Sequence, residues 1–245
     1  MNTVNTVALV TGGSRGIGAA TALRLARDGM DVVITWTQDA GAAAEVVGKI
    51  EALGRRALAV RADAGSPEGP GAAVAETVRA FGRLDVVVNN AGVGVLGPLE
   101  SLTSTDVDKV LDVNVRGCFL TSQAAAGRMG RGGRIITIGS CMTERVPGPG
   151  GTLYTMSKAS LTGLNKALAR ELGERGITAN LVHPGPVDTD MNPADGPYAG
   201  PQAALTALGR FGAPDEVASM VSFLAGPDAA YVTGGEFSVD GGHAA

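Results

Sequence analysis

The stretch "TGGSRGIG", residues 11–18, decides the fold of this 245-residue chain. It follows an apolar run over 6–11 and opens a segment of helical length, so it is a glycine-rich turn between a strand and a helix. Gly12 permits a tight turn, Gly16 lets the backbone approach a phosphate, and Gly18 lets the helix pack closely. The start of that helix offers N–H groups to a pyrophosphate. In this context we favour a dinucleotide-binding loop over a plain glycine-rich turn.

The rest of the chain repeats the same alternation of strand and helix. Because the strands are apolar throughout, they are expected to be buried on both faces of a parallel sheet. We predict a single α/β domain over 1–245, a doubly wound Rossmann-type fold with a seven-stranded parallel sheet and helices on both faces. The predicted strands are 6–11, 31–35, 57–62, 84–89, 134–139, 177–182 and 236–240, and the predicted helices are roughly 16–28, 40–53, 71–81, 105–128, 152–173 and 215–225.

One region breaks the pattern. Residues 183–212 are rich in Pro, Gly and Asp, and a long irregular segment inside a compact domain is usually a lid or a binding loop. We therefore predict a substrate lid over about 187–208.

Composition excludes several classes of function. Apolar residues make up 44% of the chain, the net charge is −4, and no basic cluster suggests a nucleic-acid partner. There is no signal-peptide pattern at the start, and no apolar run approaches the roughly 20 residues of a membrane span. Cys118 and Cys141 have no CxxC or metal-ligand spacing, which fits reduced thiols in a cytoplasmic protein. Two histidines are too few for a metal site, so no metal is expected.

The second strand indicates which dinucleotide is bound. An acidic residue at its tip would bind a ribose 2′-hydroxyl and repel a 2′-phosphate, but this strand ends in Trp36 and Thr37. Asp39 comes late and is expected to cap the next helix. Arg15 in the glycine loop is either a solvated cation or a partner for a 2′-phosphate. We predict NADP(H) as the cofactor in preference to NAD(H).

Tyr154 and Lys158 are candidates for acid/base chemistry. A spacing of four on the predicted helix 152–173 places them on one face. A neighbouring ammonium, together with a positively charged oxidised nicotinamide, would lower the tyrosine pKa from about 10 toward the working pH. An isolated pair of this kind is more often a core tyrosine and a surface lysine. Asn114 lies on an otherwise apolar helical face, where it is either a satisfied core asparagine or the holder of a water. Ser140 ends the fifth strand, where ligands bind in such folds.

Taken together, "TGGSRGIG", "NNAG" at 89–92, Ser140 and YxxxK at 154–158 resemble the short-chain dehydrogenase/reductase family over essentially the whole chain. The resemblance implies that Tyr154 is the general acid/base, Lys158 its activating partner, Ser140 the hydroxyl that orients a substrate carbonyl, and Asn114 a support for a proton relay. The residues expected to contact the cofactor are Gly12, Ser14, Arg15, Gly16, Ile17, Gly18, Trp36, Thr37, Asp63, Asn90, Ala91, Gly92, Tyr154, Lys158, Pro184, Gly185, Val187 and Thr189.

The same resemblance implies a homotetramer that reduces a small-molecule ketone or other carbonyl to a secondary alcohol with NADP(H), or catalyses the reverse reaction. Within the family, 3-oxoacyl-[acyl-carrier-protein] reductases are the most similar group, and Arg131 and Arg175 are either a carrier-docking pair or ordinary solvated arginines. An alternative is a cyclic di-GMP-binding protein that acts in signalling, because 140–151 and 184–197 resemble a subgroup in which some chains bind that nucleotide. The complete catalytic set favours the enzyme.

Overall fold

The computed structural model describes residues 6–245, and these contain a seven-stranded sheet in which all neighbouring strands run parallel. The strand order is β3-β2-β1-β4-β5-β6-β7. The order reverses between β1 and β4, where doubly wound sheets open a crevice at the carboxyl ends of their strands. The predicted fold class is therefore confirmed. The strands are β1 (Val7–Val10), β2 (Asp31–Trp36), β3 (Ala57–Arg61), β4 (Val86–Asn89), β5 (Arg134–Ile138), β6 (Thr178–Pro184) and β7 (Glu236–Val239).

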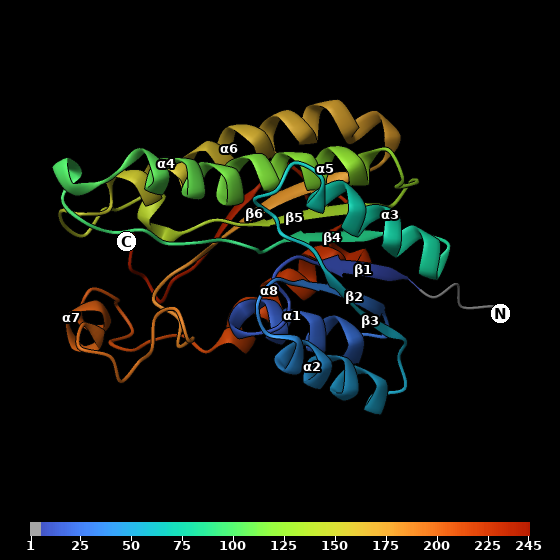
Figure 1. Ribbon diagram of the computed structural model, residues 1–245, viewed down its shortest axis with the longest axis horizontal. Coiled ribbons are helices and arrows are strands. Elements are labelled where there is room, and N and C mark those ends of the chain that lie inside the picture. Colours follow the sequence, from blue (N-terminus) through green and yellow to red (C-terminus); the bar gives the residue numbers. More distant parts are fainter. Residues whose placement is uncertain (1–5) are drawn as a thin grey trace.

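Helices cover both faces of the sheet (Figure 1). Each crossover returns the chain to the amino end of the next strand, so the loops that follow the strands gather at one end of the molecule. The short helix α7 (Ala199–Ala204) and the C-terminus lie at this end, on the left of Figure 1. One face carries α1 (Gly16–Arg27), α2 (Ala40–Ala52) and α8 (Pro214–Ala225). The other carries α3 (Gly69–Phe81), α4 (Ser104–Leu111), α5 (Cys118–Ala126) and α6 (Thr152–Leu172).

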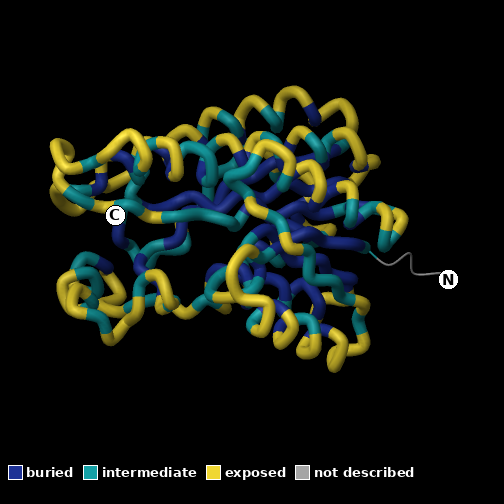
Figure 2. The backbone as a smooth tube through the Cα atoms, in the orientation of Figure 1, coloured by how far each residue is buried: buried dark blue, intermediate teal, exposed yellow. Residues whose placement is uncertain are grey.

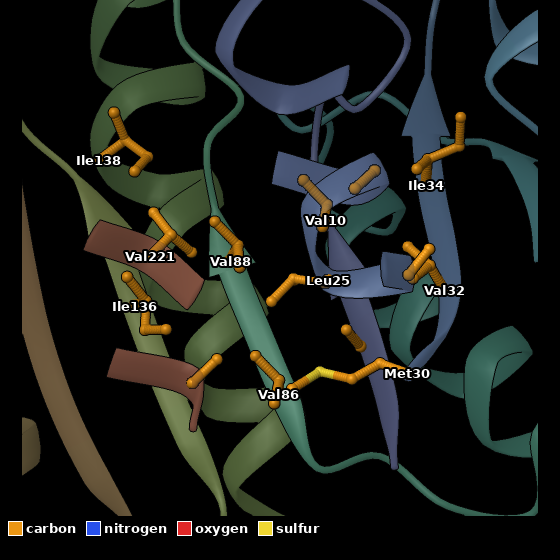
Figure 3. Close-up of a cluster of buried hydrophobic side chains, with 14 of the residues drawn as sticks. Val10, Leu25, Met30, Val32, Ile34, Val86, Val88, Ile136, Ile138 and Val221 are labelled. Atoms are coloured by element: carbon orange, nitrogen blue, oxygen red, sulfur yellow. The ribbon is translucent and has the colours of Figure 1, made fainter. Parts of the chain in front are cut away.

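The strands separate two hydrophobic layers, because successive side chains point to opposite faces. Val88 and Ile136 point to the face of α1 and α8, where Leu25 and Val221 meet them (Figure 3). Their neighbour Val87 belongs to the layer beneath α3 and α5. Figure 2 shows the strands as the most buried part of the backbone and the outer turns of the helices as the most exposed. This burial on both sides is the reason why the strand sequences do not alternate between apolar and polar residues.

The predicted helix over 105–128 is interrupted. Its first part, α4, begins with a capping box between Thr103 and Asp106, and its last part is α5. Between them Asp112–Gly117 forms a π-helical turn, a feature that often marks a functional site. Gly117 lies so close to the chain after β3 that a Cβ atom there would be 2.2 Å from the carbonyl oxygen of Ala64. The interruption therefore occurs where the helix meets its tightest backbone contact.

The irregular region 183–212 is more ordered than its composition predicts. It contains α7, and Thr189 pairs with Asn192 through backbone hydrogen bonds. At another point α3 begins at Gly69, two residues before the predicted start, with Pro70 in its first turn. Among residues 6–245, none of the helices is long and apolar enough to cross a membrane.

Candidate active site

The glycine-rich loop joins β1 to α1 at the carboxyl edge of the sheet. Gly12 and Gly16 have φ angles of 63° and 53°, in the left-handed region that glycine adopts without a steric penalty. Gly18 is buried, and a Cβ atom there would lie 2.3 Å from the carbonyl oxygen of Gly12. α1 begins without a side-chain cap and without an acidic residue in its first turn. Its first N–H groups are therefore suited to an anion.

Thr11 ties this loop to the segment after β4. Its buried hydroxyl oxygen accepts hydrogen bonds from the backbone N–H groups of Asn90 and Ala91, each at 3.0 Å. In return, the Asn90 side-chain amide donates to the carbonyl oxygens of Thr11 and Gly12 at 2.9 and 3.1 Å. Two of the segments predicted to contact the cofactor thus lie side by side, and the Asn90 amide shapes the glycine loop.

Asn114 projects from the π-helical turn toward α6 and is only 2% exposed. Its Oδ1 accepts from the N–H of Val93 at 2.9 Å, and its Nδ2 donates to the Val93 carbonyl oxygen at 3.0 Å and to Ser157 Oγ at 2.9 Å. Ser157 in turn donates to the carbonyl oxygen of Tyr154 at 2.7 Å. Asn114 is thus a satisfied buried amide joined through Ser157 to the backbone of Tyr154. Its part in a proton relay stays a prediction.

Lys158 is not a surface residue, because it is only 5% exposed. Its Nζ donates to the carbonyl oxygen of Ile138 at the end of β5, at 2.9 Å. Nζ also lies beside Gly92, where a Cβ atom would be 3.3 Å away. Burial lowers the pKa of Lys158 to about 8, against an opposing influence of Cys118. An ammonium group has three donors, so this one has N–H capacity beyond its hydrogen bond to Ile138.

The pKa of the half-buried Tyr154 is raised in the protein, whereas the sequence predicts a lowered one. Burial raises the pKa above its ordinary value, a hydrogen bond with Ser140 acts in the lowering sense, and Cys141 adds to the rise. The protein by itself therefore does not lower the pKa of Tyr154, and the lowering by Lys158 together with an oxidised nicotinamide stays a prediction. The reason is physical: the phenolate is destabilised by the loss of water around it, and this effect is larger than the favourable interactions within the chain. At neutral pH Tyr154 is a protonated phenol.

Ser140 follows β5 and starts the 3-10 turn Cys141–Thr143. Its hydroxyl oxygen accepts from the N–H of Met142 at 3.2 Å, and the residue is 7% exposed. Cys141 is buried next to it, and burial raises its pKa to about 12. A thiol of that pKa is not a nucleophile at neutral pH, which agrees with its interpretation as a bystander.

The outer rim of the site carries the groups predicted to select the cofactor. Arg15 is exposed, and its nearest acidic partner is Asp190 at 3.9 Å. Asp39 accepts a hydrogen bond from the N–H of Ala42 at 2.9 Å, which confirms that it caps α2. The ring of Trp36 lies 5.8 Å from the guanidinium carbon of Arg61. Thr37 and Asp63 are also exposed along this rim, and Ser14 and Ile17 lie half-buried in the glycine loop.

The last predicted cofactor contacts follow β6. Pro184 is buried at the end of the strand, and Gly185 packs so closely on Asp240 that a Cβ atom would be 2.6 Å from its Cα. Val187 is buried and bridges to Gly212. Thr189 lies against the glycine loop, since a Cβ atom on Gly16 would be 3.3 Å from its side chain. The structure thus brings the start of the predicted lid to the start of α1.

Comparison with known proteins agrees with this arrangement. A family model described as enoyl-(acyl carrier protein) reductase matches residues 12–244, which is nearly the whole chain. The chain belongs to the short-chain dehydrogenase/reductase family. A crystal structure of a short chain dehydrogenase from Burkholderia cenocepacia in complex with NADP is 51% identical, with a TM-score of 0.97 and 100% of both chains covered. A blue fluorescent protein from a metagenomic library, in complex with NADPH, is 50% identical with a TM-score of 0.97 over 99% of both chains. A cyclic-di-GMP-binding biofilm dispersal mediator protein from Escherichia coli is 43% identical over 95% of this chain and 94% of its own.

The two arginines considered for carrier docking are not equivalent in this short-chain dehydrogenase/reductase. Arg175 donates to the carbonyl oxygens of Ala126 and Met129, so it holds the end of α5. The side chain of Arg131 lies against Gly176, 2.9 Å from a Cβ atom placed there. Arg175 therefore has a structural role in its turn, whereas Arg131 is an exposed side chain that lies against Gly176. No group of acidic, histidine or cysteine side chains within residues 6–245 could hold a metal ion.

Sequence reasoning missed three residues that build the site of this short-chain dehydrogenase/reductase. Thr11 and Ser157 supply the hydrogen bonds that join its segments, and His183 is buried beside Ser140. For Thr11 and Ser157 a signal was present, since each is a small polar residue inside a quoted motif. For His183 the only signal was a histidine directly after the strand predicted at 177–182.

Proposed function

We propose that this oxidoreductase is an NADP(H)-dependent carbonyl reductase that reduces a ketone to a secondary alcohol and catalyses the reverse reaction. The observation that carries the proposal is the grouping of Asn114, Tyr154 and Lys158 at the carboxyl edge of the sheet, beside an uncapped helix N-terminus. Asn114 is hydrogen-bonded through Ser157 to the backbone of Tyr154, and the Lys158 ammonium donates to the carbonyl oxygen of Ile138 at the end of β5. A binding module would have no use for a buried lysine one helical turn from a half-buried tyrosine.

The glycine loop fits a dinucleotide. The positive φ angles of Gly12 and Gly16 bring the backbone close to a phosphate, and α1 presents N–H groups that no side chain caps. Arg15 and Thr37 are exposed at the tip where a ribose 2′-phosphate would lie, and the carboxyl end of β2 carries no acidic side chain, because its one acidic residue, Asp31, lies at the amino end. The NADP and NADPH complexes of relatives at 51% and 50% identity support the same choice of cofactor. Lys158 is expected to hold ribose hydroxyls with its remaining N–H groups.

Residues of the chain itself are proposed to transfer the proton to the substrate oxygen. Tyr154 holds its proton at neutral pH, as an ordinary phenol with a pKa of about 10 does, and can donate it to a carbonyl oxygen. Ser140 is expected to donate a hydrogen bond to the same oxygen and to orient the carbonyl. The nicotinamide, when bound, supplies the hydride. Lys158 is charged at neutral pH and favours the phenolate that remains after the proton has left. Asn114 holds the backbone of Tyr154 through Ser157 during this transfer.

Residues 187–208 are proposed to close over the substrate and to exclude water. Met191 and Tyr198 are large apolar side chains with 65% and 74% of their surface exposed, and both lie on this segment. They would lose that exposure on closing against a small apolar ketone.

The first experiment is a titration of the purified protein with NADPH and NADH, followed by the fluorescence of Trp36, the single tryptophan. NADPH should bind more tightly than NADH. Arg15→Ala should weaken NADPH binding by about tenfold, or about 1.4 kcal/mol, and leave NADH unchanged. Arg170→Ala on the exposed face of α6 is the matched control. Equal losses for both cofactors would contradict the 2′-phosphate assignment.

The catalytic assignment is tested with a panel of small ketones and NADPH. Tyr154→Phe keeps the ring but removes the proton, so kcat should fall by about 10²–10⁴-fold while the affinity for NADPH is retained. Wild-type rates in this variant would rule out Tyr154 as the general acid.

Cyclic di-GMP binding is the second candidate, favoured by the name of the relative from Escherichia coli at 43% identity. The same fluorescence titration distinguishes it. Tight binding of cyclic di-GMP, in competition with NADPH, would support signalling, whereas tight NADPH binding without competition supports the reductase. We also infer a homotetramer from the family resemblance, and light scattering coupled to gel filtration measures it directly.

A further inference from the structure

We propose that His183 and Glu236 are positioning residues that hold the Ser140 turn in place for catalysis. The inference rests on the proposed function, in which the Ser140 hydroxyl orients the substrate carbonyl. His183 lies on β6 with none of its surface exposed, and Glu236 lies on β7 at the edge of the sheet. Neither residue reaches the predicted reacting atoms, so any effect on catalysis must pass through Ser140.

The imidazole is in contact with the backbone of the turn. His183 Nδ1 lies 3.3 Å from the nitrogen and 3.0 Å from the carbonyl oxygen of Ser140. It is also 3.2 Å from Oγ1 of Thr143, which donates to the Ser140 carbonyl oxygen at 2.9 Å. The approach depends on Gly139, where a Cβ atom would lie 2.6 Å from Nδ1. A glycine therefore clears the space in which the ring reaches the turn.

The other ring nitrogen is held by Glu236. Nε2 of His183 lies 3.1 Å from Oε2 of Glu236. Thr162 donates to the same oxygen at 2.8 Å, and Lys166 lies 3.1 Å from Oε1. A carboxylate can only accept here, so the imidazole proton belongs on Nε2. Nδ1 is then the acceptor for the Ser140 N–H at 3.3 Å, and its approach to within 3.0 Å of the Ser140 carbonyl oxygen is a contact between two acceptors and not a hydrogen bond. The carboxylate thus fixes the tautomer of the ring that holds the turn.

This arrangement matters because the turn Cys141–Thr143 is short and belongs to no strand or long helix. The imidazole connects it across β6 to β7, and Glu236 is itself connected to α6 through Thr162 and Lys166. α6 also carries Tyr154. Ser140 and Tyr154, whose hydroxyls are predicted to contact one substrate oxygen, are therefore both connected to α6. A displacement of about 1 Å between two such groups can lower the rate by about 100-fold.

The test uses His183→Phe, which keeps a ring but removes both nitrogens. We expect kcat/KM for a ketone substrate to fall by about 10- to 100-fold, with NADPH affinity unchanged. Glu236→Leu should give a similar loss, whereas Glu236→Gln retains an acceptor for Nε2–H and should restore most of the activity. Asn180→Leu is the matched control. Asn180 is 1% exposed on the same strand. Its side-chain amide forms hydrogen bonds with the backbone of Val232 and Gly235 and none with Ser140. This control should lower the melting temperature without lowering kcat/KM.

A double-mutant cycle decides the mechanism. If His183 acts through Ser140, then His183→Phe should cause no further loss in a Ser140→Ala background. Additive losses, or losses as large in Asn180→Leu as in His183→Phe, would overturn the proposal. If His183→Phe does not fold, Glu236→Leu replaces it in the same cycle. Should Tyr154→Phe and Ser140→Ala leave reduction unaffected, the proposed function fails and this inference with it. If they lower the rate of reduction strongly while His183→Phe and Glu236→Leu remain fully active, only the positioning role is refuted.

Discussion

Replacing Lys158 by methionine should remove the pH dependence that this buried group imposes on stability. Its pKa is lowered from 10.5 to about 8 by burial. Below about pH 8 both the folded and the unfolded chain carry the proton, and the folded state bears the cost of the buried ammonium. Between about pH 8 and 10.5 only the unfolded chain keeps the proton, so unfolding takes up a proton and rising pH stabilises the fold. The full lowering corresponds to about 3 kcal/mol.

The measurement is urea unfolding of the cofactor-free wild type and Lys158→Met at pH 7 and pH 10. The free energy of unfolding of the wild type, minus that of the variant, should increase by about 2–3 kcal/mol over this interval. The subtraction cancels other titrating groups, and the coupled Cys118, with a pKa of about 11, lies above the range. Lys49→Met on the exposed face of α2 should leave the difference nearly constant, because that ammonium stays in water in both states. A flat or falling difference for Lys158→Met would refute the argument from burial.

Three further substitutions test the frame of the site. Gly18→Ala places a Cβ atom 2.3 Å from the Gly12 carbonyl oxygen, so NADPH titration should show at least a tenfold weaker affinity; wild-type affinity would refute this packing. Asp39→Ala removes the cap of α2 and should cost about 1 kcal/mol in urea unfolding; a selective loss of NADH binding would instead make Asp39 a ribose ligand. Ser157→Ala breaks the link between Asn114 and Tyr154 and should lower kcat more than it raises the Kd for NADPH, and the reverse pattern would place Ser157 in cofactor binding.

Much of the fold could be predicted because its signals are local. Strands buried on both faces must be apolar throughout, and the turn at 11–18 needs glycine at two positions with positive φ. The capping role of Asp39 followed from its place between strand and helix, and the structure confirms it. In each case the physical cause acts within a few residues along the chain.

What could not be predicted depends on distant contacts. The π-helical turn carries no residue signature of its own, and it coincides with the approach of Gly117 to Ala64, which is far away in the sequence. The sign of the Tyr154 pKa shift depends on how much water the fold removes, which spacing alone does not report. The hydrogen bond between His183 and Glu236 joins two residues that lie 53 positions apart in the sequence. The residue types therefore indicated which chemical groups the site contains, whereas tertiary packing determined their pKa values and hydrogen bonds.

The π-helical turn between α4 and α5 makes the position of Asn114 depend on the number of residues in this segment. An α-helix rotates by about 100° per residue, so a local change of hydrogen-bond pattern alters the rotational phase of everything that follows. Asn114 lies inside the turn, and the direction of its amide is therefore set by the number of residues as well as by their identity. Deleting one residue from Asp112–Gly117 would leave the catalytic side chains in the sequence and rotate part of the helix away from α6. Chain length is thus part of the information that specifies this site, and a comparison of residue types alone would overlook its loss.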